Sequence, residues 1–352
     1  KITAAPNFDD EQNPTITYTN YAGSAVTSLQ ACITLANTNA DIAYRDISKT
    51  SGTYTFTLTE AERNILRLAT ISGSDSRKLY FKIKTVIGSN TFMDTYEVTF
   101  KVINANPLLE PTAFDISTIT TGLTGNPDSI IKGYNSVSVA ANATAQKGAT
   151  ITSYKITCGD KVINTATGQF DYVENNVFNF SVTDNRGLTT TKSVTLDMVD
   201  YIKLSCNLAA TIELVGENNA AINLDIHGNY FRDTFGAVDN TIDIKYAIAA
   251  ENGEFGNWVH LDFEPTYSGN SYKLQHIISG LVYTSSYTVK AIAYDRIGGK
   301  ESTPVTLKLI PVFDWSETDF NFNVPVSFNG ATMSDFIVEQ GTTSMGSNGT
   351  WY

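Results

Sequence analysis

Residues 177–196 read VFNFSVTDNRGLTTTKSVTL, and this stretch decides the fold. Apolar residues alternate with polar ones on both sides of the turn at 184–187, which predicts two antiparallel strands joined by a tight turn. Phe178, Phe180 and Val182 fall on the same face of the first strand. We therefore expect this face to pack on a hydrophobic core.

The same pattern, two alternating segments joined by a turn, occurs twice more. Residues 79–86 read LYFKIKTV and precede YEVTFKV at 96–102, while SYTVKAIAY at 286–294 precedes PVTLKL at 304–309. Three such hairpins at regular intervals indicate repeated modules. If each hairpin closes a module, the modules have about a hundred residues each, the usual size of an immunoglobulin-like or fibronectin-type sandwich.

We therefore predict an all-β chain of tandem sandwiches followed by an extended connector. Pro107 and Pro111 mark the first linker. The expected segments are immunoglobulin-like sandwiches at 1–106 and 107–202, a fibronectin type III-like sandwich at 203–312, and an extended acidic β connector at 313–352 that leads to a distal domain beyond Tyr352.

Two local patterns refine this prediction. Thr59 and Glu62 have the spacing of a capping box, which predicts a short helix that continues through Leu68. Tyr287 follows Leu281 by six residues at the start of a strand. A tyrosine hydroxyl at such a place pins a sandwich corner to nearby backbone, which favours the fibronectin-type arrangement for the third module.

Composition excludes several classes of function. The 36 acidic and 24 basic residues give a net charge of -12, which makes nucleic acid a poor partner. No segment has the roughly 18 consecutive apolar residues that a membrane-spanning helix needs, so we expect no membrane insertion. Cys32, Cys158 and Cys206 match neither a zinc site nor a redox pair, and we expect buried thiols.

The segment 313–352 differs from the rest, because it has five acidic residues and no Lys or Arg. Its apolar residues alternate with polar ones over an extended run that includes Pro325, which favours an edge strand or connector. The apolar face would need a partner, so we expect contact with the third module or with copies of the chain, for example in a homotrimer. The expected oligomer contacts are Phe320, Phe322, Val324, Val326 and Phe328.

Residues for catalysis or for a metal do not converge in the sequence. His227, His260 and His276 have no metal-site spacing, and the acidic turns at 9–11 and 239–243 lack the ligand count of a calcium loop. No nucleophile elbow, phosphate-binding loop or cysteine–histidine pair is present. We therefore expect no enzyme, no catalytic residues, no metal site and no cofactor.

Carbohydrate binding remains open, because sugars stack on exposed aromatic rings beside amides and acids. Residues 227–235 read HGNYFRDTF and contain Tyr230 and Phe231, and Trp258 lies further along. These three residues are the candidate sugar contacts. The alternative is core packing of Tyr230, Phe231 and Phe235, because most aromatic residues of a sandwich are buried.

Several short segments of the sequence resemble segments of minor structural proteins from the tails of long-tailed phages that infect Gram-positive bacteria. The most specific is FDWS at 313–316, followed by FNFNVPV at 320–326 and DFIVEQG at 335–341. Weaker similarity extends over most of the chain. Its phrases are LTEAER at 58–63, YFKIKTV at 80–86, GATITSY at 148–154, TDNRG at 183–187, NYF at 229–231 with FG at 235–236, and GTWY at 349–352.

The resemblance implies a tail-tip or tail-fibre protein that spaces and presents a host-attachment region. Its expected partners are other phage tail proteins, with host cell-surface glycan as a candidate ligand. Such a protein assembles in the host cytoplasm and ends in the virion tail. The alternative is a modular accessory region of a secreted bacterial glycan hydrolase or surface adhesin, since these also string together such modules.

Overall fold

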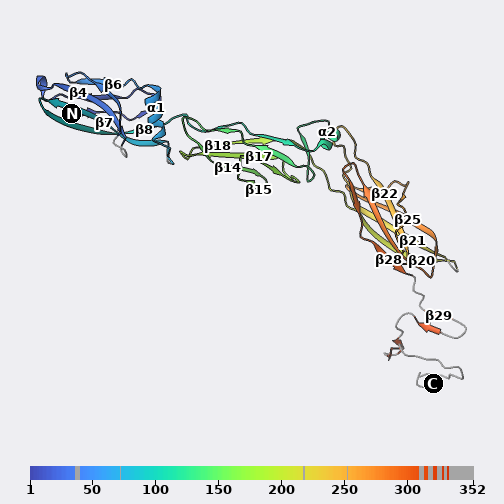
Figure 1. The fold of residues 1–352 in the computed structure, drawn as a ribbon. Coiled ribbons are helices and arrows are strands. Elements are labelled where there is room, and N and C mark those ends of the chain that lie inside the picture. Colours follow the sequence, from blue (N-terminus) through green and yellow to red (C-terminus); the bar gives the residue numbers. More distant parts are fainter. Residues whose placement is uncertain are drawn as a thin grey trace. The chain divides into compact units, whose positions relative to one another are not determined.

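The computed structural model describes most of the chain as β-structure (Figure 1). The described residues are 1–35, 40–71, 73–216, 219–251, 253–308, 313–315, 320–322, 327–328 and 331–332. Among them, no helix is long and apolar enough to cross a membrane. The predicted all-β class is confirmed.

In its described residues, the first module contains two sheets and one α-helix. Three strands pair in the order β1-β3-β6, and five pair in the order β2-β8-β7-β4-β5. The predicted hairpin is β7 and β8, with Phe81 opposite Tyr96. The elements are β1 (Ile2–Ala4), β2 (Phe8–Asp9), β3 (Thr15–Tyr18), the 3-10 helix η1 (Gly23–Ala25), β4 (Ser28–Leu35), β5 (Asp41–Asp46), β6 (Gly52–Thr55), α1 (Glu60–Leu68), β7 (Ser76–Ile87) and β8 (Asn90–Lys101).

Helix α1 begins at the predicted capping box. The Glu62 amide donates to the Thr59 hydroxyl at 3.2 Å, and the Thr59 amide donates to the Glu62 carboxylate at 2.8 Å. Two amides that the helix leaves without a partner are thereby satisfied. The sequence prediction for this helix is confirmed, including its end at Leu68.

Replacing Thr59 with alanine is expected to destabilise the first module by about 1 kcal/mol, because the cap bond to the Glu62 amide is lost. Chemical unfolding followed by circular dichroism measures this change. Thr50→Ala is the matched control, because Thr50 is exposed and lies outside any helix or strand. Equal losses in the two variants would contradict a specific role for the cap.

The second module repeats the two-sheet arrangement. Its sheets have the orders β10-β12-β16 and β15-β14-β17-β18, and two further strand pairs join β11 with β19 and β13 with β9. The predicted hairpin is β17 and β18. The elements are β9 (Leu108–Leu109), β10 (Thr112–Asp115), α2 (Thr118–Thr124), β11 (Ser129–Ile131), β12 (Val137–Ala140), β13 (Ala143–Thr144), β14 (Ile151–Cys158), β15 (Lys161–Ile163), β16 (Thr167–Phe170), β17 (Val177–Asp184), β18 (Thr189–Thr195) and β19 (Asp197–Val199).

The third module has sheets of order β20-β21-β25-β24 and β23-β22-β26-β27, with β28 also paired to β26. Its tyrosine corner forms as predicted: the Val282 amide donates to the Tyr287 hydroxyl at 2.8 Å, and this hydroxyl donates to the Val282 carbonyl at 3.2 Å. The strands are β20 (Asn207–Val215), β21 (Asn219–Asn229), β22 (Asp243–Ala250), β23 (Val259–His260), β24 (Thr266–Ser268), β25 (Ser271–Val282), β26 (Ser286–Tyr294), β27 (Gly299–Glu301) and β28 (Val305–Lys308).

Each module has its own hydrophobic core in the described part of the chain. The cores extend from Ile2 to Ala105, from Leu109 to Leu196 and from Leu204 to Ala293. Phe178, Phe180 and Val182 are buried side by side on the inner face of β17, as the alternation predicted. Burial of such apolar side chains supplies most of the stability of a sandwich.

The three cysteines are free and buried, as predicted. Cys32 belongs to the first module, Cys158 to the second and Cys206 to the third. Burial raises the pKa of the Cys32 thiol to about 11 and also raises the pKa of the other two. These thiols are therefore protonated and poorly reactive at neutral pH.

The chain divides into two compact units. Unit 1 consists of Lys1–Tyr201 with Phe235–Val238, and unit 2 of Ile202–Thr234 with Asp239–Tyr352. The first two cores thus belong to the same unit. The predicted boundary near residue 106 stays a prediction.

Short strands continue beyond the third module. Strand β29 (Phe313–Trp315) pairs with β30 (Phe320–Phe322), and β31 (Ser327–Phe328) pairs with β32 (Ala331–Thr332). The predicted extended run at 320–328 therefore begins and ends in strands. Its middle, 323–326, lies outside the described residues.

Candidate functional site

Two of the three predicted sugar contacts are buried in the third module. Tyr230 is 4% exposed and Phe231 is 8% exposed. The Tyr230 ring lies 6.2 Å from the Tyr267 ring and belongs to the core of the module. Neither residue presents a ring face on which a sugar could stack, so the structure places both in the core and not on a binding surface.

Trp258, the third predicted sugar contact, is half-buried beside a cation. The Lys290 ammonium lies 4.9 Å from the centre of the Trp258 ring and 4.5 Å from that of Phe255, and it pairs with Glu301 at 2.9 Å. A cation over an aromatic face is an attractive interaction in its own right. Trp258 therefore has a structural contact that the sequence did not indicate.

The histidines lie beside carboxylates or aromatic rings. The two ring nitrogens of His260 lie 2.6 Å from Asp243 and 2.6 Å from Asp262. The His276 ring packs near Tyr246 and Phe263, and burial lowers its pKa. No group of three or more His, Cys, Asp or Glu that could hold a metal ion occurs in the described part of the chain.

The predicted oligomer contacts are only partly covered by the structure. Phe320 and Phe322 belong to β30, and Phe328 belongs to β31. Val324 and Val326 lie outside the described residues. The prediction that this run contacts other chains therefore stays a prediction.

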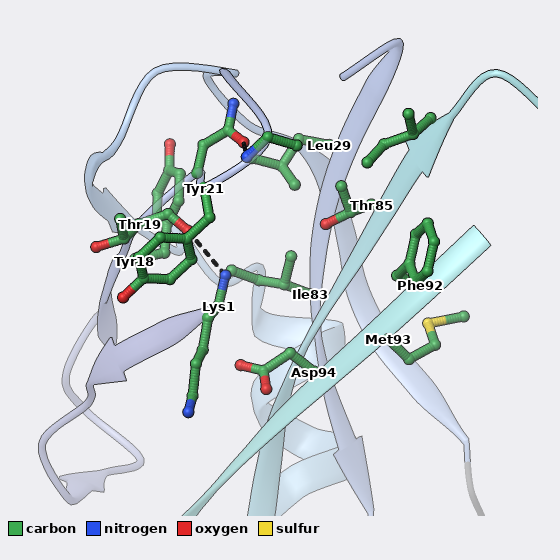
Figure 2. Close-up of a pocket in the computed structure, with 13 residues that line it drawn as sticks. Lys1, Tyr18, Thr19, Tyr21, Leu29, Ile83, Thr85, Phe92, Met93 and Asp94 are labelled. Atoms are coloured by element: carbon green, nitrogen blue, oxygen red, sulfur yellow. Dashed lines mark hydrogen bonds between the residues drawn. The ribbon is translucent and has the colours of Figure 1, made fainter. Parts of the chain in front are cut away.

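The first module has a hollow of about 350 Å³ at one end of its sandwich. Figure 2 shows Tyr18, Thr19 and Tyr21 on one side of it and Thr85 and Phe92 on the other. Buried Leu29 and Ile83 also line the hollow, and Asp94 lies at its margin. This volume is in the range of small-molecule sites.

A few contacts hold the walls of the hollow. The Lys1 backbone nitrogen donates to the Thr19 carbonyl at 2.8 Å (Figure 2). The Ile2 amide donates to the Asp94 carboxylate at 2.6 Å. The Tyr18 hydroxyl donates to the Ser48 carbonyl at 2.8 Å, and burial raises the pKa of this tyrosine. Tyr18 thus supports the wall with its ring while its hydroxyl is satisfied inside the module.

A second feature of unit 1 is the turn between β17 and β18. The Asp184 carboxylate accepts the amides of Arg186 at 2.9 Å and Leu188 at 3.0 Å, and Gly187 supplies the positive φ of 84°. An aspartate that accepts nearby amides and a glycine with positive φ are the usual components of such a turn. The turn holds Arg186 in one backbone conformation.

The Arg186 side chain joins the first two modules. It is 1% exposed, and its guanidinium donates to the Thr70 hydroxyl at 3.0 Å and to the Arg67 carbonyl at 3.2 Å, both at the end of α1. It also donates to the carbonyls of Gln146 at 3.0 Å and Lys147 at 2.6 Å. A cation of the second module thereby lies at the C-terminal end of the first module's helix, where a positive charge is favourable.

We call the contacts of Arg186 with groups of both modules the joint. A buried carboxylate lies close to it. The Asp10 side chain is inaccessible to solvent and pairs with Arg67 at 2.7 Å and with Lys147 of the second module at 2.9 Å. Burial alone would raise the pKa of Asp10, but bonds from Lys147, the Ile103 amide and Arg67 lower it overall. Burial lowers the pKa of Arg186, while the carboxylates of Asp184 and Asp10 oppose this shift.

Acid is expected to weaken the joint. Because the folded-state pKa of Asp10 is below its ordinary value of 3.8, its stabilising contribution is fully present above that pH. It is lost as the pH falls through the folded-state pKa. The free energy of unfolding, measured between pH 6 and 2, should fall less steeply with decreasing pH in Asp10→Asn than in the native chain.

Asp128→Asn is the control for this titration, because Asp128 is exposed. Its acid dependence should match that of the native chain. If Asp10→Asn matched it too, the Asp10 carboxylate would not hold the two modules together.

The contacts of Arg186 could not be predicted from the sequence. An Asp-Asn-Arg-Gly turn predicts a solvent-exposed arginine, since turns lie on the surface and arginine is rarely buried. Nothing in the local pattern signals that Thr70 and Lys147 surround Arg186. The hollow could not be predicted because Tyr21 and Phe92 are more than seventy residues apart in the sequence.

The sheets, registers and cores define a series of immunoglobulin-like β-sandwich modules. No protein-family model matches the chain, and no curated protein matches it in sequence. Among solved structures, the chain is similar to a 1.5-MDa bacterial ice-binding adhesin studied for host cell surface retention, with 11% identity and a TM-score of 0.29 over 85% of this chain and 91% of that one. It is also similar to Sidekick-1 immunoglobulin domains 1-5, with 11% identity and a TM-score of 0.29 over 88% of this chain and 58% of that one.

Proposed function

We propose that the chain is a structural spacer, not an enzyme, and that it presents an attachment region on a surface-exposed assembly. The joint around Arg186 carries this proposal. A flexible linker between modules needs no buried cation, whereas Arg186 makes four hydrogen bonds to groups of both modules. A joint of this kind restricts the geometry between neighbouring modules, which is the property that a spacer requires.

Distance measurements between spin labels test the spacer role. The labels would be attached through Lys49→Cys in the first module and Lys192→Cys in the second, since both lysines are exposed. The buried native thiols should react slowly by comparison. We expect a single narrow distance distribution that broadens in Arg186→Met and stays narrow in Arg296→Met, which changes an exposed arginine. A broad distribution in the native chain would refute the spacer role.

The assembly itself is proposed from the sequence. The phrases at 313–316 and 320–326 favour a phage tail, in which the partners are other tail proteins and the chain resides in the virion. The second candidate is a bacterial surface adhesin or an accessory region of a secreted glycan hydrolase, and the series of immunoglobulin-like modules supports this candidate. Immunogold labelling with antibodies against the chain separates the two: label on phage tails supports the first, and label on the bacterial surface supports the second.

Self-association through 313–352 is part of the tail proposal. Light scattering on the chain with and without these residues gives the mass of each form. A trimer that becomes a monomer on removal of 313–352 supports the proposal. Identical monomer masses would refute it.

A further inference from the structure

The hollow of the first module gathers exposed apolar side chains. Tyr21 is 77% exposed, Phe92 is 54% exposed and Met93 is 57% exposed, and all three line it. Single exposed apolar side chains are common, but their gathering around one hollow marks a surface on which a ligand could bind. Figure 2 shows Tyr21 and Phe92 on opposite sides of this space.

The hollow also offers polar groups. Within the described residues, the hydroxyls of Thr19, Tyr21 and Thr85 make no hydrogen bond, and only one carboxylate oxygen of Asp94 accepts one, from the Ile2 amide. An apolar ligand would cover these groups without replacing their bonds to water, at a cost in binding free energy. The lining therefore suits a ligand that has both apolar faces and hydroxyl groups.

We propose that this hollow binds one neutral sugar ring of a surface glycan. The C–H face of the sugar would lie against Tyr21 or Phe92, and its hydroxyls would bond with Thr19, Thr85 and Asp94. The lining includes one acidic side chain, that of Asp94, and one basic side chain, that of Lys1, so its side chains have no excess of either charge. The site is separate from the joint, and its failure would leave the spacer role standing.

Saturation-transfer NMR on the whole chain tests the site. The probes are glucose, galactose, rhamnose, N-acetylglucosamine and the disaccharides chitobiose and lactose, each at up to about 10 mM, which detects a Kd near 1 mM. We expect transfer to the C–H protons of at least one probe. Tyr21→Ala and Phe92→Ala should each weaken that binding about tenfold.

Matched variants separate this site from nonspecific aromatic binding. Phe114→Ala and Phe263→Ala remove rings that are 51% and 62% exposed elsewhere in the chain, and both should leave binding unchanged. Thr85→Val keeps the shape of the side chain and removes its hydroxyl, so it should weaken binding while the thermal unfolding of the module stays near that of the native chain.

Three outcomes would overturn the proposal. In the first, none of the sugar probes binds. In the second, the control variants weaken binding of the probe as much as Tyr21→Ala and Phe92→Ala do. In the third, the hollow takes up an uncharged apolar peptide, or mediates self-association that Tyr21→Ala abolishes, while no sugar binds. Thermal unfolding confirms that each variant is folded, which is expected because Tyr21 and Phe92 are exposed.

Discussion

Arg186→Met is expected to destabilise unit 1 by about 3 kcal/mol, because it removes the four hydrogen bonds of a buried cation. The Lys147 carbonyl and the Thr70 hydroxyl lose this donor, whereas the Gln146 carbonyl keeps its bond from the Ala149 amide. Methionine fills much of the same space but donates no hydrogen bond. The end of α1 also loses the positive charge that lies beside it.

Scanning calorimetry measures this change and reveals its origin. In the native chain we expect the first two modules to unfold together, since they share a buried joint. In Arg186→Met we expect their transition to split in two, because each module keeps its own core. Arg296→Met should change neither the number of transitions nor their midpoints. A destabilised variant that still unfolds in one transition would show that Arg186 stabilises its own module and does not couple the two.

Gly228→Ala is expected to destabilise the third module by about 3 kcal/mol, because adding a methyl group to space that other atoms already fill has a cost of this order. A Cβ atom at residue 228 would lie 2.0 Å from the Ser205 carbonyl oxygen and 3.0 Å from the Tyr272 ring. That oxygen cannot move freely, because it accepts the Tyr272 hydroxyl at 2.9 Å. Strand β21 must therefore shift, or Tyr272 must lose its bond.

Gly298→Ala is the matched control in the same module. No atom lies within 4 Å of the Cβ position at residue 298, and its φ is not positive. Its unfolding midpoint in urea should therefore stay close to that of the native chain. If Gly228→Ala were equally well tolerated, the close approach of β21 to Ser205 would not constrain the module.

Local patterns in this sequence predicted local structure well. Alternation identified the hairpins of β7–β8 and β17–β18, and the Thr59–Glu62 spacing identified the start of α1, because each depends on residues that are near one another in the chain. The tyrosine corner at Tyr287 was also predicted from a spacing of a few residues. These features follow from the periodicity of side chains along a strand and from hydrogen bonds between residues that are close in the sequence.

The functional features could not be predicted in the same way. Arg186 is separated from Thr70 by 116 residues, and the hollow combines Tyr21 with Phe92. Such contacts depend on how distant strands come together, and a single sequence does not encode them in any local period. Tyr230 and Phe231, the predicted sugar contacts, are buried, and alternation does not distinguish an aromatic ring in the core from one on a surface.

The separation of the three buried cysteines, one in each module, has a consequence for how the protein matures. Since Cys32, Cys158 and Cys206 form no covalent cross-link, reductant neither removes a constraint on the folded chain nor assists its formation. The modules can reach their final form in a thiol-rich compartment and keep it after transfer to an oxidising one. Folding therefore needs no dedicated oxidation step.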